Sequence, residues 1–249
     1  MKKICLLSIL ALVMMMVSCS EDAGGSSGGT AQPAKPPVSP GGPGGVWVDT
    51  DGSLKIQATI YIVNEMNGQL VPATVFNGRT ISAHIRDYHN STQVDSATIS
   101  NGEFSLTIPV PPDALLVKAS NSEFSEVLTS GHDVEVGSLE LYIDYSPWPG
   151  PSINVWLRSN ISIKMEIHGG IPYIYADGDD TGYVYSKGDV SCFGNERDDY
   201  YGEAYHVDMK LTQGWNVLTQ SAFDNGNVLN ITMISQNPPN DAIWVCYNY

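Results

Sequence analysis

Residues 45–64 read GVWVDTDGSLKIQATIYIVN, and the second half of this stretch decides the class of fold. Successive side chains of a strand point to opposite faces of a sheet, so a half-buried strand alternates apolar and polar residues. The apolar face here is formed by Leu54, Ile56, Ala58, Ile60 and Ile62, and the polar face by Lys55, Gln57, Thr59 and Tyr61. The stretch therefore predicts a long strand with one buried face.

The same alternation recurs through residues 80–143, with turn signals between the runs. Asn67-Gly68 and Asn101-Gly102 each separate two alternating runs, and Asn-Gly is a strong short-range hairpin signal. We therefore expect the strands on either side of Asn101-Gly102, within DSATISNGEFSLTIP, to pair with each other.

Residues 153–249 also read as short alternating runs, separated by Gly, Asn or Asp turns, and no window of comparable length has a helical period. The stretch DYSPWPGPS at 144–152 holds three prolines, which withhold hydrogen-bond donors from a ladder. The sequence thus predicts an all-β protein with two β-sandwich units of the immunoglobulin-like or transthyretin-like kind. Their expected bounds are 46–146 and 153–249, with a proline-rich hinge at 147–152.

The first unit carries a pattern that resembles a known family. In SNGEFSLTIPVPPDALLVKAS, a turn glycine, alternating core residues and a closing proline are Gly102, Phe104, Leu106, Ile108 and Pro109. This is similar to carboxypeptidase-regulatory-like and transthyretin-like domains, small β-sandwiches of many bacterial surface proteins. The resemblance implies a sandwich fold and a role in spacing, scaffolding or binding.

The charge composition of the chain indicates which classes of partner to expect. The chain has 12 Lys and Arg against 27 Asp and Glu, a net charge of -15. A nucleic-acid partner needs a basic footprint, so this balance excludes nucleic acid as an expected partner. The 24 Gly and 15 Pro suit strands that are joined by tight turns.

Residues 1–18 have the pattern of a secretory signal peptide. Lys2 and Lys3 form a positively charged n-region, and the apolar run from Ile4 to Val17 has 14 residues. Spanning a bilayer takes roughly 20 apolar residues, so this run predicts a cleaved signal and not a membrane span.

The end of that run, Met16-Val17-Ser18-Cys19, resembles the lipobox of bacterial lipoproteins. In that family a small residue precedes a cysteine that is diacylated and becomes the first residue of the mature protein. The resemblance implies lipidation of Cys19, although Met16 stands where the family usually has leucine. The alternative is an ordinary secretory signal with an incidental cysteine.

The residues after Cys19 bear on location. Ser20-Glu21-Asp22 is similar to the acidic signal that sends lipoproteins of some Gram-negative bacteria to the outer face of the outer membrane. We therefore expect a lipid anchor in the outer membrane with the protein facing the exterior; a periplasm-facing anchor is the alternative. Residues 19–45, rich in Gly, Ser and Pro, predict a disordered linker that holds the body off the membrane.

Two cysteines remain for the body, Cys192 and Cys246. Outside the cytoplasm they can form a disulfide, which would contribute on the order of 4 kcal/mol in the chain-entropy model. The other interpretation makes Cys246 a small buried residue of the last strand and Cys192 a loop thiol. Their spacing in the sequence leaves both interpretations open.

A search for catalytic motifs returns none of the patterns G-x-S-x-G, H-E-x-x-H, P-loop or C-x-x-C. Ser130, His132 and Asp133 lie next to one another, whereas a triad needs groups that converge from separate segments. We therefore expect no catalytic residues and no enzyme, while sites assembled only in three dimensions escape such a search.

One acidic stretch has the spacing of a calcium-binding loop. DGDDTG places Asp177, Asp179 and Thr181 at alternate positions before Gly182, and a hard cation prefers several oxygen ligands from one tight turn. The later bidentate glutamate is missing, because Gly188 stands there. The stretch is thus either a calcium site, the sole cofactor that the sequence suggests, or a solvated turn.

A second stretch, NERDDYYGEAYH, mixes carboxylates with aromatic rings. Rings stack on the C–H faces of sugars while carboxylates accept hydrogen bonds from hydroxyls, so this mixture is typical of a glycan-binding surface. The alternative is an ordinary protein surface. The candidate ligand-binding residues are Glu196, Asp198, Asp199, Tyr200, Tyr201 and Tyr205.

These observations lead to a first hypothesis of function: a lipid-anchored outer-membrane lipoprotein that acts as a non-catalytic, adhesin-like binding or scaffolding module for a glycan or a surface protein. The alternative is a carbohydrate-binding accessory of a polysaccharide-uptake system, which exposed aromatic rings on a flat or grooved surface would favour. An enzyme is the third hypothesis, and a pocket with paired carboxylates would favour it.

Overall fold

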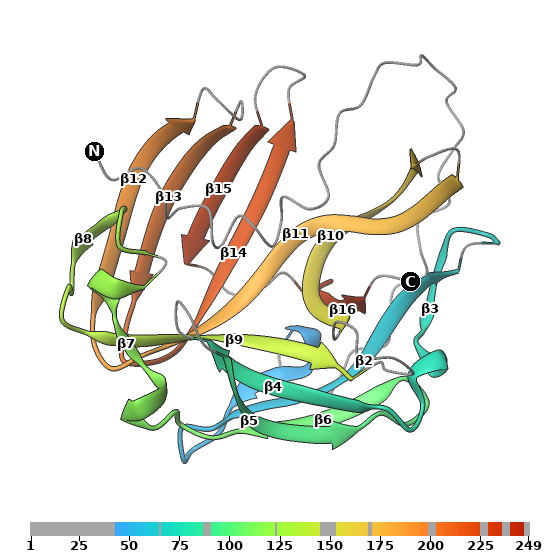
Figure 1. Cartoon of the computed structure of the whole chain (residues 1–249), viewed down its shortest axis with the longest axis horizontal. Helices are drawn as coiled ribbons and strands as arrows, with labels where there is room; N and C mark the ends of the chain where they lie inside the picture. Colours follow the sequence, from blue (N-terminus) through green and yellow to red (C-terminus); the bar gives the residue numbers. More distant parts are fainter. Residues whose placement is uncertain are drawn as a thin grey trace.

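The computed structural model describes residues 43–64, 66–86, 91–122, 124–144, 153–168, 171–198, 203–224, 229–235 and 240–246. In these ranges the elements are strands and single 3-10 turns, which confirms the all-β prediction (Figure 1). The strands are β1 (Val46–Val48), β2 (Leu54–Asn64), β3 (Gln69–Pro72), β4 (Thr80–Arg86), β5 (Ser91–Thr98), β6 (Glu103–Ile108), β7 (Val117–Lys118), β8 (Leu128–Ser130), β9 (Glu135–Ile143), β10 (Ile153–His168), β11 (Ile171–Ser186), β12 (Val190–Asp198), β13 (Glu203–Leu211), β14 (Gly214–Asp224), β15 (Leu229–Ser235) and β16 (Ile243–Cys246). The 3-10 turns are η2 (Pro43–Gly45), η3 (Thr74–Phe76), η4 (Asp113–Leu115) and η5 (Ala119–Asn121).

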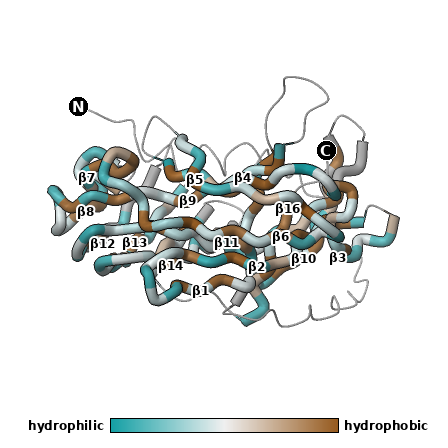
Figure 2. Tube along the Cα trace, turned by 90° about the horizontal axis from the view of Figure 1, so that it is seen from below, coloured by the Kyte–Doolittle hydropathy of each residue, from teal (hydrophilic) through white to brown (hydrophobic). Residues whose placement is uncertain are grey.

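The amino-terminal strands form two facing layers. In one layer β2 pairs with β1, β6 and β3, and in the other β4 lies between β5 and β9. The core between the layers takes the alternate residues that the sequence indicated, because Leu54, Ile56, Ala58 and Ile60 are all buried in one cluster. Figure 2 shows hydrophobic and hydrophilic segments alternating along the strands.

The turn at Asn101-Gly102 is confirmed, but the expected hairpin across it is wrong. Both residues have positive φ, 54° and 78°, as the turn requires. The flanking strands share only one isolated bridge, Ser100 to Glu103, because β5 pairs with β4 in one layer and β6 pairs with β2 in the other. The turn therefore carries the chain from one layer to the other.

A second core lies against the carboxy-terminal strands. The sheet continues from β9 through β11, β14, β15, β13 and β12 to β8. Ala119, Phe124, Val127 and Val134, from the segment between β6 and β9, contribute to this core. Phe124 is buried in the same cluster as Val207, Met209 and Ile231. Figure 1 shows β12, β13, β15, β14 and β11 side by side in this order.

Strands from the two predicted units pair with each other. β9 pairs with β10 and β11, β8 pairs with β12, and β16 pairs in parallel with β2, so the described strands form one sixteen-stranded sheet. The division into two units stays a prediction, and the hinge at 147–152 lies outside the described residues.

The end of the predicted linker belongs to the body. Trp244 donates a hydrogen bond from its indole nitrogen to the carbonyl oxygen of Gly44, at 2.8 Å, and Gly45 is buried. The rest of the linker and the signal peptide, residues 1–42, lie outside the described residues.

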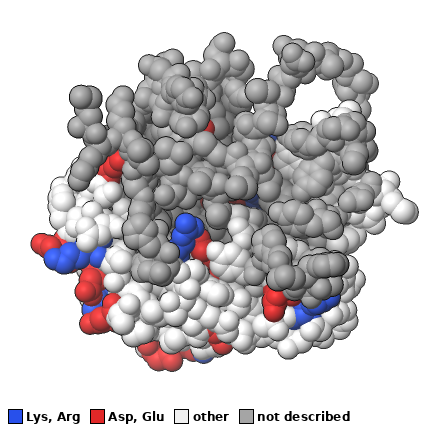
Figure 3. Space-filling model, viewed as in Figure 1, with Lys and Arg blue, Asp and Glu red and all other residues white. Residues whose placement is uncertain are grey.

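Charged side chains on the described surface gather in small groups of both signs, with uncharged surface between them (Figure 3). Lys118 with Asp133, and Lys187 with Asp113 and Glu135, form such groups. The acidic excess is thus partly offset locally by ion pairs.

Candidate functional site

A pocket lies where three strands meet. β10 and β11 form a hairpin, and β9 runs across its open end. The pairs around this junction are Leu157–Thr181 between β10 and β11, Val155–Leu141 between β10 and β9, and Tyr183–Leu139 between β11 and β9. Between these pairs lie Glu140 of β9, Trp156 of β10 and Gly182 of β11. Each of the three pairs with another strand on its outer side but has no partner on the side that faces the junction, so the sheet is open there. We call this space the junction pocket.

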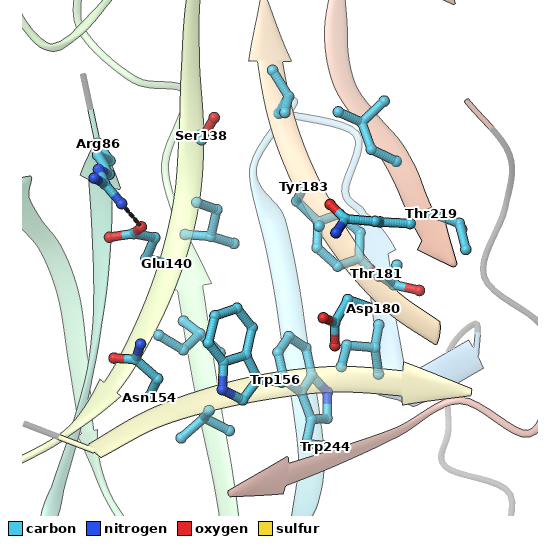
Figure 4. A pocket seen from close by; sticks show the side chains of 18 of the residues that line it. Arg86, Ser138, Glu140, Asn154, Trp156, Asp180, Thr181, Tyr183, Thr219 and Trp244 are labelled. Carbon is cyan, nitrogen blue, oxygen red and sulfur yellow. Dashed lines mark hydrogen bonds and ion pairs between the residues drawn. The ribbon is translucent and has the colours of Figure 1, made fainter. Parts of the chain in front are cut away.

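The junction pocket has a volume of about 180 Å³ and is lined mainly by apolar side chains (Figure 4). Because the sheet is open at the junction, residues from both of its faces line the pocket. Tyr183 belongs to the amino-terminal core, while its neighbour Val184 belongs to the carboxy-terminal core. The aromatic rings in the lining include Trp156, Tyr183 and Trp244.

Two carboxylates line the pocket, and an arginine binds each of them. Arg86 Nη1 donates to Glu140 Oε1 at 2.7 Å, the contact drawn as a dashed line in Figure 4, and the Tyr142 hydroxyl donates to the other oxygen of Glu140. Arg158 donates from Nε to Asp180 Oδ1 at 2.6 Å and from Nη2 to Oδ2 at 3.4 Å. The formal charges of these four groups therefore cancel.

The buried ion pair is held firmly in place. Arg158 is 8% exposed, and its Nη1 also donates to the Ala176 carbonyl oxygen at 2.7 Å. Burial raises the pKa of Asp180, and the attraction of Arg158 acts against that rise. Burial likewise raises the pKa of Tyr142 and Tyr183, so both phenols stay protonated at neutral pH.

Two hydroxyls in the pocket wall have no hydrogen-bond partner within the described part of the chain. They are Thr181 Oγ1 and Thr219 Oγ1, and their residues are 8% and 4% exposed. The two threonines face each other across β11 and β14. A buried hydroxyl without a partner costs free energy, so each such group requires an explanation.

The calcium-loop prediction is wrong in its local structure, because residues 177–182 lie within strand β11. An extended strand lacks the tight turn with which a calcium-binding loop wraps several oxygen ligands around one ion. Asp177 pairs with Lys164 at 2.5 Å, and Asp179 accepts a hydrogen bond from Asn160 at 2.6 Å. Among the described residues, no three His, Cys, Asp or Glu side chains are grouped to hold a metal ion.

The DGD sequence, residues 177–179, instead lies opposite a β-bulge in β10. The register shifts between Ser159 and Ser162 of β10, opposite Gly178. A Cβ atom at Gly178 would overlap the backbone carbonyl oxygen of Ser159, so the close approach of the two strands requires glycine there. Asn160, with φ of 52°, completes the bulge.

The predicted glycan-binding stretch is only partly described. Glu196 and Asp198 lie in β12 without described side chains, and Asp199, Tyr200 and Tyr201 lie outside the described residues. The expectation that Tyr205 offers a surface ring is wrong. Tyr205 is buried in the carboxy-terminal core, where its hydroxyl donates to the buried carboxylate of Glu203.

Cys192 and Cys246 are free and buried in different cores, so the disulfide interpretation is wrong for this structure. Cys246 is a buried residue of the last strand, as the other interpretation had it, whereas Cys192 lies in strand β12 and not in a loop. Burial raises the pKa of the Cys192 thiol to about 11 and that of Cys246 to about 12, so both are protonated at neutral pH. Cys19 lies outside the described residues.

The residues of the junction pocket were not found by sequence reasoning, apart from Thr181, which had been assigned to calcium. Glu140, Trp156, Thr219 and Trp244 come from four strands that are distant in the sequence. Asp180 lies inside the DGDDTG stretch, but its side chain points to the face opposite Asp177 and Asp179. No local motif relates these residues, because only strand pairing brings them together.

Comparison with protein-family models, with curated proteins and with solved structures finds no match for this chain. In the part of the chain that the structure describes, no helix has the length and apolarity needed to cross a membrane.

Proposed function

We propose that the chain is a lipoprotein, anchored through Cys19 in the outer membrane and facing the cell exterior, whose β body is a non-catalytic, adhesin-like binding module. The observation that carries the binding role is the junction pocket. It joins a mainly apolar, aromatic wall to polar and charged side chains, and small-molecule sites combine these two kinds of lining.

The charges at the pocket support binding over catalysis. A pocket with two carboxylates is the feature that would favour an enzyme, and Glu140 and Asp180 both line this one. Each carboxylate is however bound to an arginine, Arg86 or Arg158, within 2.7 Å. General acid–base chemistry needs a carboxyl group that is free to exchange a proton with the substrate.

The anchor is supported by the sequence alone. The amino-terminal stretch resembles a lipoprotein signal, because a positively charged n-region and a short apolar run lead to a small residue before Cys19. Two or more acyl chains give stable anchoring where a single chain does not. The linker that follows would hold the pocket away from the membrane surface.

Replacing Cys19 tests the anchor. Cys19→Ala is expected to abolish incorporation of radioactive fatty acid, because the acylated thiol is gone, and to leave a protein that is either soluble or still carries its signal peptide. The matched control is Glu21→Ala with Asp22→Ala, which keeps the thiol. This control should retain the label but lose sensitivity to protease added outside the cells. Label on the Cys19→Ala protein would overturn the anchor, and equal digestion of control and parent would overturn the acidic export signal.

The second candidate function, carbohydrate binding, is favoured by exposed aromatic rings on the carboxy-terminal strands. Phe193 and Phe223 are 57% and 69% exposed, and strand register places them on the same face of the sheet. The Phe193 ring lies edge-on to His206, with ring centroids 6.4 Å apart. A glycan array probed with the full chain and with its Phe193→Ala variant tests this second candidate. If sugars bind to the exposed rings on this face, the variant should lose the glycan signal that the parent gives.

A further inference from the structure

We propose that the junction pocket binds a neutral molecule of about one aromatic ring with a single polar substituent, of the phenol class, and that Thr181 and Thr219 hydrogen-bond that substituent. This inference rests on the proposed binding function and names the class of ligand for the same site.

The volume of the pocket sets the size of the ligand. An apolar cavity of about 150 Å³ accommodates benzene, so the 180 Å³ of the junction pocket accommodates one ring with a small substituent. Trp156, Tyr183 and Trp244 supply ring surfaces against which an aromatic ligand can pack edge-to-face or in an offset stack.

The charge of the pocket sets the charge of the ligand. Arg86 with Glu140, and Arg158 with Asp180, leave no net formal charge among the ionic groups of the site. A charged ligand would lose its hydration shell without gaining an unpaired counter-charge from these groups. A neutral ligand avoids that loss.

The two threonine hydroxyls set the polarity of the ligand. Thr181 Oγ1 and Thr219 Oγ1 line the pocket, are more than nine-tenths buried and have no partner in the described ranges. A hydroxyl can both donate and accept, so the pair suits a ligand group that does the same. A monosaccharide carries several hydroxyls, more than these two threonines can satisfy, and the other polar side chains of the lining include Ser138, Asn154 and Gln220. Glucose is therefore one of the comparison ligands in the experiment.

The experiment measures binding of phenol to the full chain by titration calorimetry, with toluene, benzoate, benzylammonium and glucose as comparisons. Phenol and toluene have nearly the same shape and differ in the group that would meet the threonines. We expect phenol to bind about tenfold more tightly than toluene, in line with one or two hydrogen bonds, and the other three probes to bind more weakly still.

Valine variants of the two threonines should weaken phenol binding but stabilise the unliganded protein. Thr181→Val and Thr219→Val should each weaken phenol binding by about five- to tenfold. Each should also raise the melting temperature of the unliganded protein by about 2–4 °C, because an unsatisfied buried hydroxyl is replaced by a methyl group of similar shape. Binding and stability therefore change in opposite senses.

Ser159→Ala is the matched control. The hydroxyl of Ser159 is also fully buried and without a partner in the described residues, but it does not line the pocket. This variant should raise the melting temperature and leave phenol binding unchanged.

Three results would overturn the inference. The first is equal affinity of the parent for phenol and toluene, together with unchanged phenol affinity in the two valine variants. The second is a lower melting temperature in both valine variants, which would show that the hydroxyls have partners. The third is the absence of phenol binding. Glucose binding without phenol binding would reject the ligand class while leaving the binding module in place, and the acylation and protease measurements test the anchored module separately.

Discussion

Arg158→Met is expected to lower the free energy of unfolding by about 3–5 kcal/mol, because it leaves the Asp180 carboxylate buried without its counter-charge. The side chains of Arg158 and Asp180 are only 9% and 20% exposed, so water replaces the lost partner poorly. Arg158 also satisfies the Ala176 carbonyl oxygen, which the variant leaves unbound by this donor. Denaturant titration of parent and variant at neutral pH measures the difference.

The loss should depend on pH in a defined direction. The pKa of Asp180 is already raised above its ordinary value of 3.8, and removal of Arg158 raises it further. A carboxyl whose folded pKa is raised binds more protons in the folded state than in the unfolded state, so stability falls as pH rises through that window. The variant should therefore recover stability as the pH falls toward 4.

Two further variants control this measurement. Lys118→Met removes the cation of an exposed ion pair, Lys118 with Asp133, and should cause no measurable change. Arg158→Met combined with Asp180→Leu removes both buried charges and should recover a large part of the loss. A single variant as stable as the parent, or a double variant no better than the single one, would show that the pair does not stabilise this site.

Gly178→Ala is expected to lower the free energy of unfolding by about 1–3 kcal/mol, because its new methyl group would overlap the Ser159 carbonyl oxygen. That oxygen belongs to the backbone, so relief requires β10 and β11 to move apart at the bulge. The bulge lies close to the junction, and we expect the shift to weaken phenol binding as well. Thermal and denaturant unfolding measure the first effect, and calorimetry measures the second.

Gly194→Ala provides the control for this substitution. Gly194 also lies in a strand, but a Cβ atom there would meet Val127 at 3.5 Å, an ordinary van der Waals contact. Loss of the same size in both variants would mean that strand glycines in general are needed, and not the close approach at the bulge.

Local patterns predicted the strands well where each strand buries a single face. The run from Leu54 to Ile60 and the run Phe104, Leu106 and Ile108 both bury alternate residues, as expected. The DGDDTG stretch was misassigned because its acidic residues and glycines are typical of turns, whereas cross-strand pairing with β10 holds it extended. Tyr205 was misplaced because a tyrosine with a buried carboxylate partner resembles a surface tyrosine in sequence.

The sequence by itself determined the all-β class and the core faces of many of its strands, because period-two alternation is a local property that burial of one face enforces. It also carries the signal and lipobox pattern on which the proposed anchor rests. Only the tertiary structure decided that β5 and β6 part into different layers and that β9 crosses the open end of the β10–β11 hairpin. The junction pocket follows from that crossing. Its residues come from distant strands, and their proximity depends on long-range pairing, which alternation within a strand does not specify.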